Sequence, residues 1–428
     1  MIGTRIVGIR HRIKRNAEQE ARPTQVAIIS EGEVITYDLP DDTAELDWAR
    51  GVFPTSMRKV EADDDLSVFS SHHIAWKKLK VGEADRETFN RGHLKKEGNE
   101  WLLAYKVPAT FDGLKPGDKV AMVLGGSGDR FAYALSRAGE KIEAGVWRVP
   151  PFTLNDFREG QKEEDATNLA KLLEALPEVF YPVTLKDRQL IKLRKALQGR
   201  TDAMKARISC EQRLRQHFVG EIFCDEDGLY PEGSIELAFD RAKSSDAILQ
   251  ALFLEEKVRE KELVSMVKSL DVYQRLFAPI KGCGPMIATR LIVAIQDIRR
   301  FETPAKLKAF CGVHVMPDGK FVRRRHGVVA NWHSEARQAL YLLGDQFNRN
   351  PDSPWGQKLR EYKRKLREAH PEPVVMDGKK RYSDGHIHKM AVWRTLTKFV
   401  EHLWHEWRRI ANNQISSGQD DKEEKLAA

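Results

Sequence analysis

The stretch KVAMVLGGSGDRFAYALSRAGEKIEAGVW, residues 119–147, decides the fold class of this chain. Its apolar run Val120–Leu124 predicts a buried strand, Gly125–Gly128 a tight turn, and Arg130–Ala138 a helix. A further strand is expected over Lys141–Trp147. Strand, turn, helix and strand in this order predict an α/β layer. The glycine run has neither the lysine of a P-loop nor the spacing of a dinucleotide fingerprint, so it gives a nucleotide site little support.

Segments on both sides extend this layer. Short apolar runs at Arg5–Ile9, Gln25–Ser30 and Glu33–Asp38 predict three strands of a meander. The polar, basic segment between the first two is expected to be a protruding loop. A plausible strand at Trp101–Tyr105 is followed, after the central unit, by a predicted helix at Asp165–Leu176. The N-terminal part of the chain therefore belongs to the α/β class.

The domain organisation expected from these patterns is α/β plus α. An α/β domain covers residues 1–183, with an insertion at about 45–115. Residues 184–275 predict two long helices, arranged as an antiparallel hairpin or as a dimerising coiled coil. Residues 276–412 predict a mostly helical C-terminal domain, and the polar residues 413–428 a disordered tail. The helices expected in the C-terminal domain are Met286–Ile295, Pro304–Phe310, Ser334–Asn348, Gly356–Glu368 and His388–Ile410.

Positive charge is concentrated in two segments. The net charge is +8, yet residues 185–216 alone contain ten Lys or Arg against three Asp or Glu. Residues 275–410 contain twenty-seven against thirteen. Two basic segments beside an acidic remainder predict a polyanionic partner, with solvated helix faces as the alternative.

Composition excludes several classes of protein. No stretch approaches twenty apolar residues, which argues against a membrane partner, and the basic N-terminus does not resemble a secretory signal. The four cysteines show no Cys-x-x-Cys spacing, so neither a disulfide framework nor a zinc ribbon is expected. These features predict a reduced, cytoplasmic protein.

Two motifs favour contact with a nucleic-acid backbone. In Ile280–Pro285, the residues Lys281, Gly282 and Gly284 precede an amphipathic helix, as in a helix-hairpin-helix element that binds phosphates through backbone N–H groups. An ordinary glycine turn is the alternative. A second motif follows an Asp318-Gly319 turn and consists of three consecutive arginines, whose planar guanidinium groups suit phosphate; a solvated basic hairpin is its alternative. These arginines are Arg323, Arg324 and Arg325.

The ordered C-terminal landmarks resemble those of the insertion-sequence one-ten family, which includes the Piv/MooV DNA invertases and transposases guided by a bridge RNA. They are the stretch from Ala278 to Arg290, Ile298–Phe301, Leu307–Gly312 and Arg337–Leu340. Weaker N-terminal landmarks extend the resemblance over nearly the whole chain: Ile6–Ile9, Val120–Gly128 and Asp165–Ala170.

The resemblance implies a RuvC-like (RNase H-like) domain with four metal-binding carboxylates, a coiled coil, and a terminal domain with a nucleophilic serine. Such carboxylates would hold Mg²⁺ near a scissile phosphate. Here the pattern breaks, because Arg10, Gly125 and Lys162 stand at three of the four acidic positions and only Asp165 remains. The nucleophile position aligns with Asp318.

The leading hypothesis is therefore a domesticated, cleavage-deficient transposase relative that binds DNA and, by resemblance, a structured RNA. It would be a dimer or tetramer associated with a prokaryotic nucleoid, with no cofactor. One alternative is an active transposase or site-specific recombinase that binds Mg²⁺ through the displaced acids Asp129, Glu163 and Glu164, with Ser334 as a displaced nucleophile. The other is a coiled-coil assembly or regulatory subunit. The residues expected to contact nucleic acid, besides those of the two motifs, are Arg337 and, on the first long helix, Lys192, Arg194, Lys195 and Arg207.

Overall fold

A computed structural model describes residues 5–12, 21–79, 89–228, 233–317, 319–324, 326–327, 330–376 and 379–427, the last fifteen of them as backbone only. The chain divides into two compact units, Met1–Arg188 and Gln189–Ala428. Each unit is described by itself below. No helix among the described residues is both long enough and apolar enough to cross a membrane.

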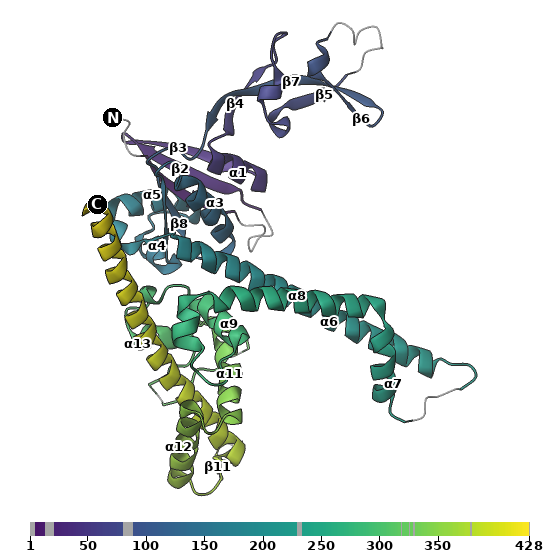
Figure 1. The fold of residues 1–428 in the computed structure, drawn as a ribbon, viewed down its shortest axis with the longest axis vertical. Helices are drawn as coiled ribbons and strands as arrows, with labels where there is room; N and C mark the ends of the chain where they lie inside the picture. The colour runs from purple at the N-terminus through teal and green to yellow at the C-terminus, as the bar shows by residue number, and fades with distance from the viewer. Residues whose placement is uncertain are drawn as a thin grey trace. The chain divides into compact units, whose positions relative to one another are not determined.

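The first unit is built on a six-stranded mixed sheet (Figure 1). Strands β1 (Ile6–Arg10), β2 (Thr24–Ser30) and β3 (Glu33–Leu39) form the predicted antiparallel meander. On its other side β1 pairs in parallel with β8 (Lys119–Val123), and β8 pairs in parallel with β9 (Gly145–Val149). The short β10 (Tyr181–Pro182) completes the sheet antiparallel to β9.

Alternation along the strands divides the core into two layers. Val7 and Ile9 face one layer with residues of α1 (Asp42–Arg50) and α3 (Asp129–Gly139). The opposite layer is formed with α4 (Pro151–Phe157) and α5 (Asp165–Ala175). Helix α5 lies so close to β1 that a Cβ at Gly8 would be 1.8 Å from the backbone oxygen of Ala166.

The insertion forms a second sheet. Strand β7 (Glu100–Asp112) pairs antiparallel with β4 (Phe53–Lys59), β5 (Ala75–Lys78) and β6 (Leu94–Glu97). The sequence predicted only the part of β7 at Trp101–Tyr105. Two other boundaries also differ. Strand β9 begins at Gly145 instead of Lys141, because residues 140–144 form a turn in which Glu143 has a φ of 57°. Strand β1 includes Arg10, which the sequence placed in a loop whose residues 13–20 lie outside the described part.

The second unit begins with an antiparallel helical hairpin, the first of the two predicted arrangements. Helix α6 (Leu185–Phe223) and helix α8 (Ala247–Lys268) lie side by side (Figure 1), joined by ion pairs from Arg200 and Arg207 to Glu256. A short helix between them, α7 (Ile235–Ala242), was not predicted.

The remaining helices of the second unit share one large core with the base of this hairpin. They lie close to the predicted ranges, although the last helix starts earlier, at Asp384. Its backbone is helical to Ala427, where the sequence predicted disorder; the Lys, Glu and Gln of this tail are also good helix formers. The helices are α9 (Pro285–Ile295), α10 (Pro304–Phe310), α11 (Ser334–Arg349), α12 (Pro354–Ala369) and α13 (Asp384–Ala427), beside the hairpin β11 (Val374–Met376) and β12 (Lys379–Arg381).

Candidate functional site

The carboxyl ends of β1 and β8 meet at one edge of the six-stranded sheet, an edge where parallel strands commonly present ligands. Ile9 is opposite Met122, so Arg10 and the turn starting at Gly125 end neighbouring strands. Arg10 is half-buried, and its Nε is enclosed without a hydrogen-bond partner. Gly125 has a φ of 88° and offers no side chain. Neither residue can ligate a divalent cation. We refer to this region, with the start of α5, as the strand-end edge.

Asp165, the only retained acidic position, is bound by an arginine. Its two carboxylate oxygens accept hydrogen bonds of 2.6 and 2.8 Å from Nε and Nη2 of Arg158. Asp165 is 9% exposed, and the hydrogen bond raises the pKa of Arg158. Such a two-bond pair uses one acceptor position on each carboxylate oxygen and offsets the charge that would attract a metal. Asp165 therefore fastens the loop before α5 and has little capacity left for a cation.

Lys162 and Glu163 are exposed in the short helical turn η5 (Lys162–Glu164) that leads into α5. Glu163 forms an ion pair with Arg22. A backbone hydrogen bond at Glu163, followed by the charges of Arg22 and Arg10, lowers the pKa of this carboxyl. Glu163 is thus already paired with one guanidinium group and stabilised in its charged form by a second.

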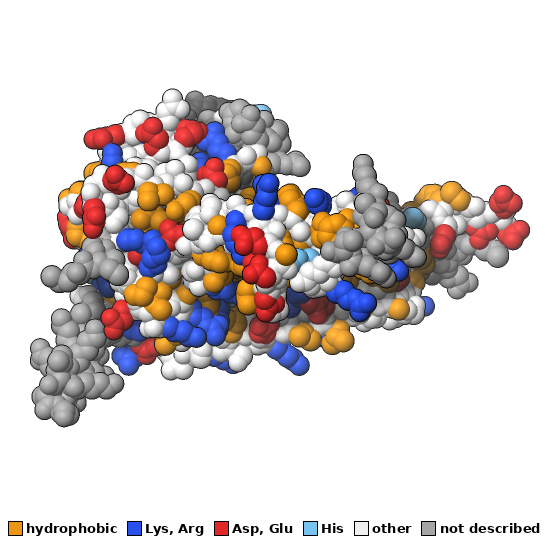
Figure 2. All heavy atoms as spheres, turned by 90° about the horizontal axis from the view of Figure 1, so that it is seen from above, with side chains coloured by type: hydrophobic (Ala, Val, Ile, Leu, Met, Phe, Trp, Pro, Cys, Tyr) orange, Lys and Arg blue, Asp and Glu red, His pale blue; other side chains and the backbone are white. Residues whose placement is uncertain are grey.

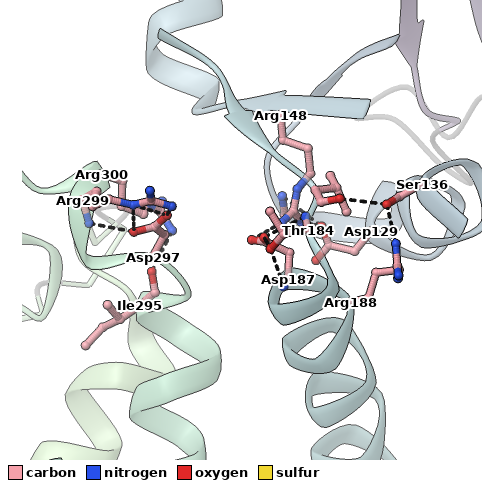
Figure 3. Close-up of polar contacts among 12 residues, drawn as sticks. Asp129, Ser136, Arg148, Thr184, Asp187, Arg188, Ile295, Asp297, Arg299 and Arg300 are labelled. Atoms are coloured by element: carbon pink, nitrogen blue, oxygen red, sulfur yellow. Dashed lines mark hydrogen bonds and ion pairs between the residues drawn. The ribbon is translucent and has the colours of Figure 1, made fainter. Parts of the chain in front are cut away.

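Asp129 is also paired, in a buried network shown in Figure 3. Nη1 of Arg148 donates to Asp129 Oδ1 at 2.9 Å, and Nη2 donates to Asp187 Oδ1 at 3.3 Å. Asp129 and Arg148 are each 3% exposed. The Gly125 N–H also donates to Asp129 Oδ1, at 3.2 Å. Asp129 therefore anchors the glycine turn and does not extend into solvent.

His11, which the sequence analysis did not single out, connects the glycine-rich turn to the neighbouring elements. His11 Nδ1 lies 2.9 Å from Ser127 Oγ, and His11 Nε2 lies 3.2 Å from Glu45 Oε1. The hydroxyl of Thr24 donates to the same Glu45 oxygen at 2.6 Å. These bonds fix the turn to β1 and α1. The sequence Gly125–Gly128 predicted a turn, but it did not indicate that His11 would contact this turn.

Within the part of the chain that the structure describes, one group of side chains has metal-ligand spacing. It consists of Asp47, His72 and His73, on α1 and on the short helical turn η2 (Ser71–His73) of the insertion. None of these residues was singled out from the sequence. The adjacent histidine pair was the only available signal, and the distant Asp47 could not be assigned to it.

In the second unit, the turn Ile280–Pro285 is shaped by packing. Gly282 has a φ of 91°, and a Cβ there would lie 2.9 Å from Cβ of Gln346 on α11. Gly284 has open space around it, and Lys281 is exposed. Burial raises the pKa of the neighbouring Cys283 thiol to about 12. Gly282 is thus required by helix packing, whereas Gly284 and Lys281 are accessible to a ligand.

The arginine motif lies beside a cavity of about 1110 Å³. The predicted turn is present: Gly319 has a φ of 73° and Val315 bridges Phe321. Asp318 and Arg325 lie outside the described residues. Arg324, which is exposed, lines a neighbouring hollow that also contains Ser334.

We call the first of these hollows the basic cavity. The arginine motif, β12 and α13 contribute four cations to its lining. These four cations form no ion pair with a described acidic side chain. Three aromatic rings lie among these cations, and the rings of Phe321 and Trp393 have centroids 6.3 Å apart. The four cations are Arg323, Arg381, Lys389 and Arg394, and the aromatic residues are Phe321, Tyr382 and Trp393.

Arg337 supports the wall of this cavity. Its guanidinium donates to the carbonyls of Gly312 at 2.7 Å and Val322 at 2.8 Å. It also lies over the rings of Trp332 and Trp393, 4.5 and 4.7 Å from their centroids. Burial lowers its pKa. These contacts hold Arg337 in the cavity wall, and the direct phosphate contact expected from the sequence stays a prediction.

The basic face of α6 is divided in the same way. Arg207 donates to Glu256 at 2.6 Å and covers the ring of Phe253, so it joins the two helices of the hairpin. Lys192 and Lys195 are exposed, and Arg194 lines a small cavity of about 310 Å³. Figure 2 shows charges of both signs interspersed on the face that it displays. Local geometry, more than net charge, therefore indicates where a polyanion would bind.

Residues 274–356 match the family model described as "Transposase IS116/IS110/IS902 family". This segment contains the turn before α9, the arginine motif and all of α11. A comparison with curated proteins gives no significant match. The family resemblance seen in the sequence is thus confirmed for residues 274–356, which are similar to the transposases of the IS116/IS110/IS902 family.

Proposed function

We propose that this chain is a transposase-derived nucleic-acid-binding protein whose α/β domain, RuvC-like by resemblance, does not perform metal-dependent strand cleavage. The observation that carries the proposal is the state of the strand-end edge. Arg10 replaces the first carboxylate, and Asp165 is held by Arg158 through both oxygens. Mg²⁺ requires oxygen ligands in near-octahedral geometry, and like charges repel it at close range. The residues at this edge therefore do not fit a Mg²⁺ site.

Binding is assigned to the basic cavity of the second unit. Arginine recognises phosphate through its planar fork, and aromatic rings stack with bases regardless of sequence. The cavity presents both groups in one hollow. Lys281 is exposed on a separate turn of the same unit. DNA is the partner implied by the family. A structured RNA along exposed residues of α6, such as Lys192 and Lys195, is the additional partner that the resemblance suggests.

The alternative of an active enzyme with displaced acids finds little support. Two of the three candidate acids are paired with an arginine, Asp129 with Arg148 and Glu163 with Arg22, whereas Glu164 is exposed. The alternative of an assembly subunit rests on the helical hairpin. The two helices of that hairpin are joined within one chain by ion pairs such as Arg200–Glu256, while large apolar side chains of α8, among them Leu254 and Val258, are exposed.

A paired binding and cleavage experiment tests the proposal. Labelled duplex DNA and a structured RNA are titrated with the full chain across a salt series, and the same DNA is then incubated with Mg²⁺ or Mn²⁺. We expect affinity that falls steeply with salt and cleavage no greater than that of Asp165→Ala. Metal-dependent cleavage that disappears in Asp165→Ala would overturn the loss of catalysis. Binding that is absent or independent of salt would overturn the nucleic-acid function.

A further inference from the structure

Two adjacent imidazoles converge on one carboxylate oxygen where the insertion meets α1. His72 Nε2 and His73 Nε2 each lie 2.8 Å from Asp47 Oδ2. The two rings have centroids 4.2 Å apart. The three ligand atoms all lie within 4.8 Å of one another. Ring nitrogens and carboxylate oxygens are the donors that Zn²⁺ prefers when thiolates are absent.

The burial of the three side chains suits a bound cation. Those of Asp47 and His73 are 5% and 6% exposed, whereas that of His72 is 44% exposed. The group thus has an enclosed base and one side open to solvent.

We propose that Asp47, His72 and His73 form a zinc site, with solvent as the fourth ligand at the open side. Tetrahedral coordination with bonds of about 2.0 Å separates ligand atoms by roughly 3.3 Å. The two present separations must therefore widen by about half an ångström. The exposed His72 side chain can make this adjustment. Each imidazole would bind through Nε2 as the neutral tautomer that keeps its proton on Nδ1.

The insertion provides a reason for such a site. Among the described residues of the insertion, the core cluster contains four buried hydrophobic residues, one of which, Ile74, follows His73 directly. Small domains with little core are often stabilised by a structural metal. Zinc would fasten η2 to Asp47 on α1, which packs in the core of the six-stranded sheet through Trp48. This role is structural and does not depend on the proposed function.

The test is zinc binding by the full chain after removal of metal with a chelator. Calorimetry with ZnCl₂ should give one site per chain, and thermal melting should shift upwards with zinc. His72→Ala should weaken binding at least tenfold and abolish the shift. His217→Ala, at an exposed histidine of α6, is the matched control and should behave as the unmodified chain.

A second readout uses Co²⁺, whose visible absorption is intense in four-coordinate sites. We expect this absorption in the unmodified chain and in His217→Ala, but not in His72→Ala. Asp47→Asn should also lose this absorption. If that variant does not fold, the result for His72→Ala, at an exposed side chain, still tests the proposal. Failure to bind one zinc, or equal binding by His72→Ala, would show that these residues form hydrogen bonds only and would overturn the proposal.

Discussion

The strand-end edge of the first unit and the basic cavity of the second differ in what their charges contact. At the edge and in the network beside it, Asp165 is paired with Arg158 and Asp129 with Arg148. In the cavity, Arg323, Lys389 and Arg394 form no ion pair with a described acidic side chain. Charges that are satisfied inside a fold contribute to its stability, while charges left exposed in a hollow are available to a ligand. Substitutions at the two places should therefore change different measurements.

The largest effect is expected at Arg148. Arg148→Ala leaves Asp129 buried without its cation, which should lower the free energy of unfolding by about 3–5 kcal/mol. Urea denaturation of the full chain, monitored by tryptophan fluorescence, measures this loss. The control is Arg364→Ala, because Arg364 pairs with Glu368 on an exposed helix face. This variant should lower the free energy of unfolding by no more than about 0.5 kcal/mol. Equal losses in the two variants would remove the distinction between satisfied and exposed charges.

The cavity should show the opposite pattern. The triple variant Arg323→Ala, Lys389→Ala and Arg394→Ala should weaken nucleic-acid binding about 100-fold at low salt and reduce the salt slope by about 2–3. Its free energy of unfolding should stay within about 0.5 kcal/mol of the unmodified chain, because all three side chains are exposed.

A charge-matched control separates local contact from net charge. The control replaces three exposed lysines of α8 by alanine: Lys257, Lys261 and Lys268. Fluorescence anisotropy across a salt series measures both triple variants. Loss of affinity in both to the same extent would mean that the cavity is not the binding surface.

Much of the fold followed from local patterns, whereas the pairing at the sites did not. Val120–Leu124 and the glycine turn behind it predicted β8 and its exit correctly, because strand period and turn residues are local properties. The family landmarks also indicated Arg10 and Gly125, and the structure brings them to one edge. Nothing local, however, indicates that Arg148 will meet Asp129, or that Asp47 will meet His72. Such contacts depend on how distant elements pack.

Two glycines of one turn, Gly282 and Gly284, provide a second comparison between a residue required for packing and an accessible one, with smaller expected effects on stability. Gly282→Ala would force a left-handed backbone and place its Cβ 2.9 Å from Gln346, so it should destabilise the chain by about 2 kcal/mol. Gly284→Ala meets open space at a negative φ and should cost less than about 1 kcal/mol, as an N-cap change does. Chemical denaturation compares them. If Gly284→Ala nevertheless weakens DNA binding, the turn contacts the ligand as the helix-hairpin-helix hypothesis predicts.

The smallest expected effect is the response of the cavity to pH. Burial, and then the charges of Arg381, Arg323 and Lys389, lower the pKa of His386 in the free protein. A bound polyanion would offset these cations and raise that pKa, so binding and protonation should favour each other. Affinity should therefore increase as pH falls through the region below the ordinary histidine pKa of about 6.5.

His386→Gln should remove this increase while leaving affinity at pH 8 within about twofold, since the histidine is then neutral. Binding isotherms at pH 8.0, 7.0 and 6.0 at constant ionic strength provide the measurement. His405→Gln, on the same helix but outside the cavity lining, is the control and should retain the increase. An identical pH response in the two variants would show that the polyanion binds away from His386. The assignment of binding to the basic cavity would then be wrong.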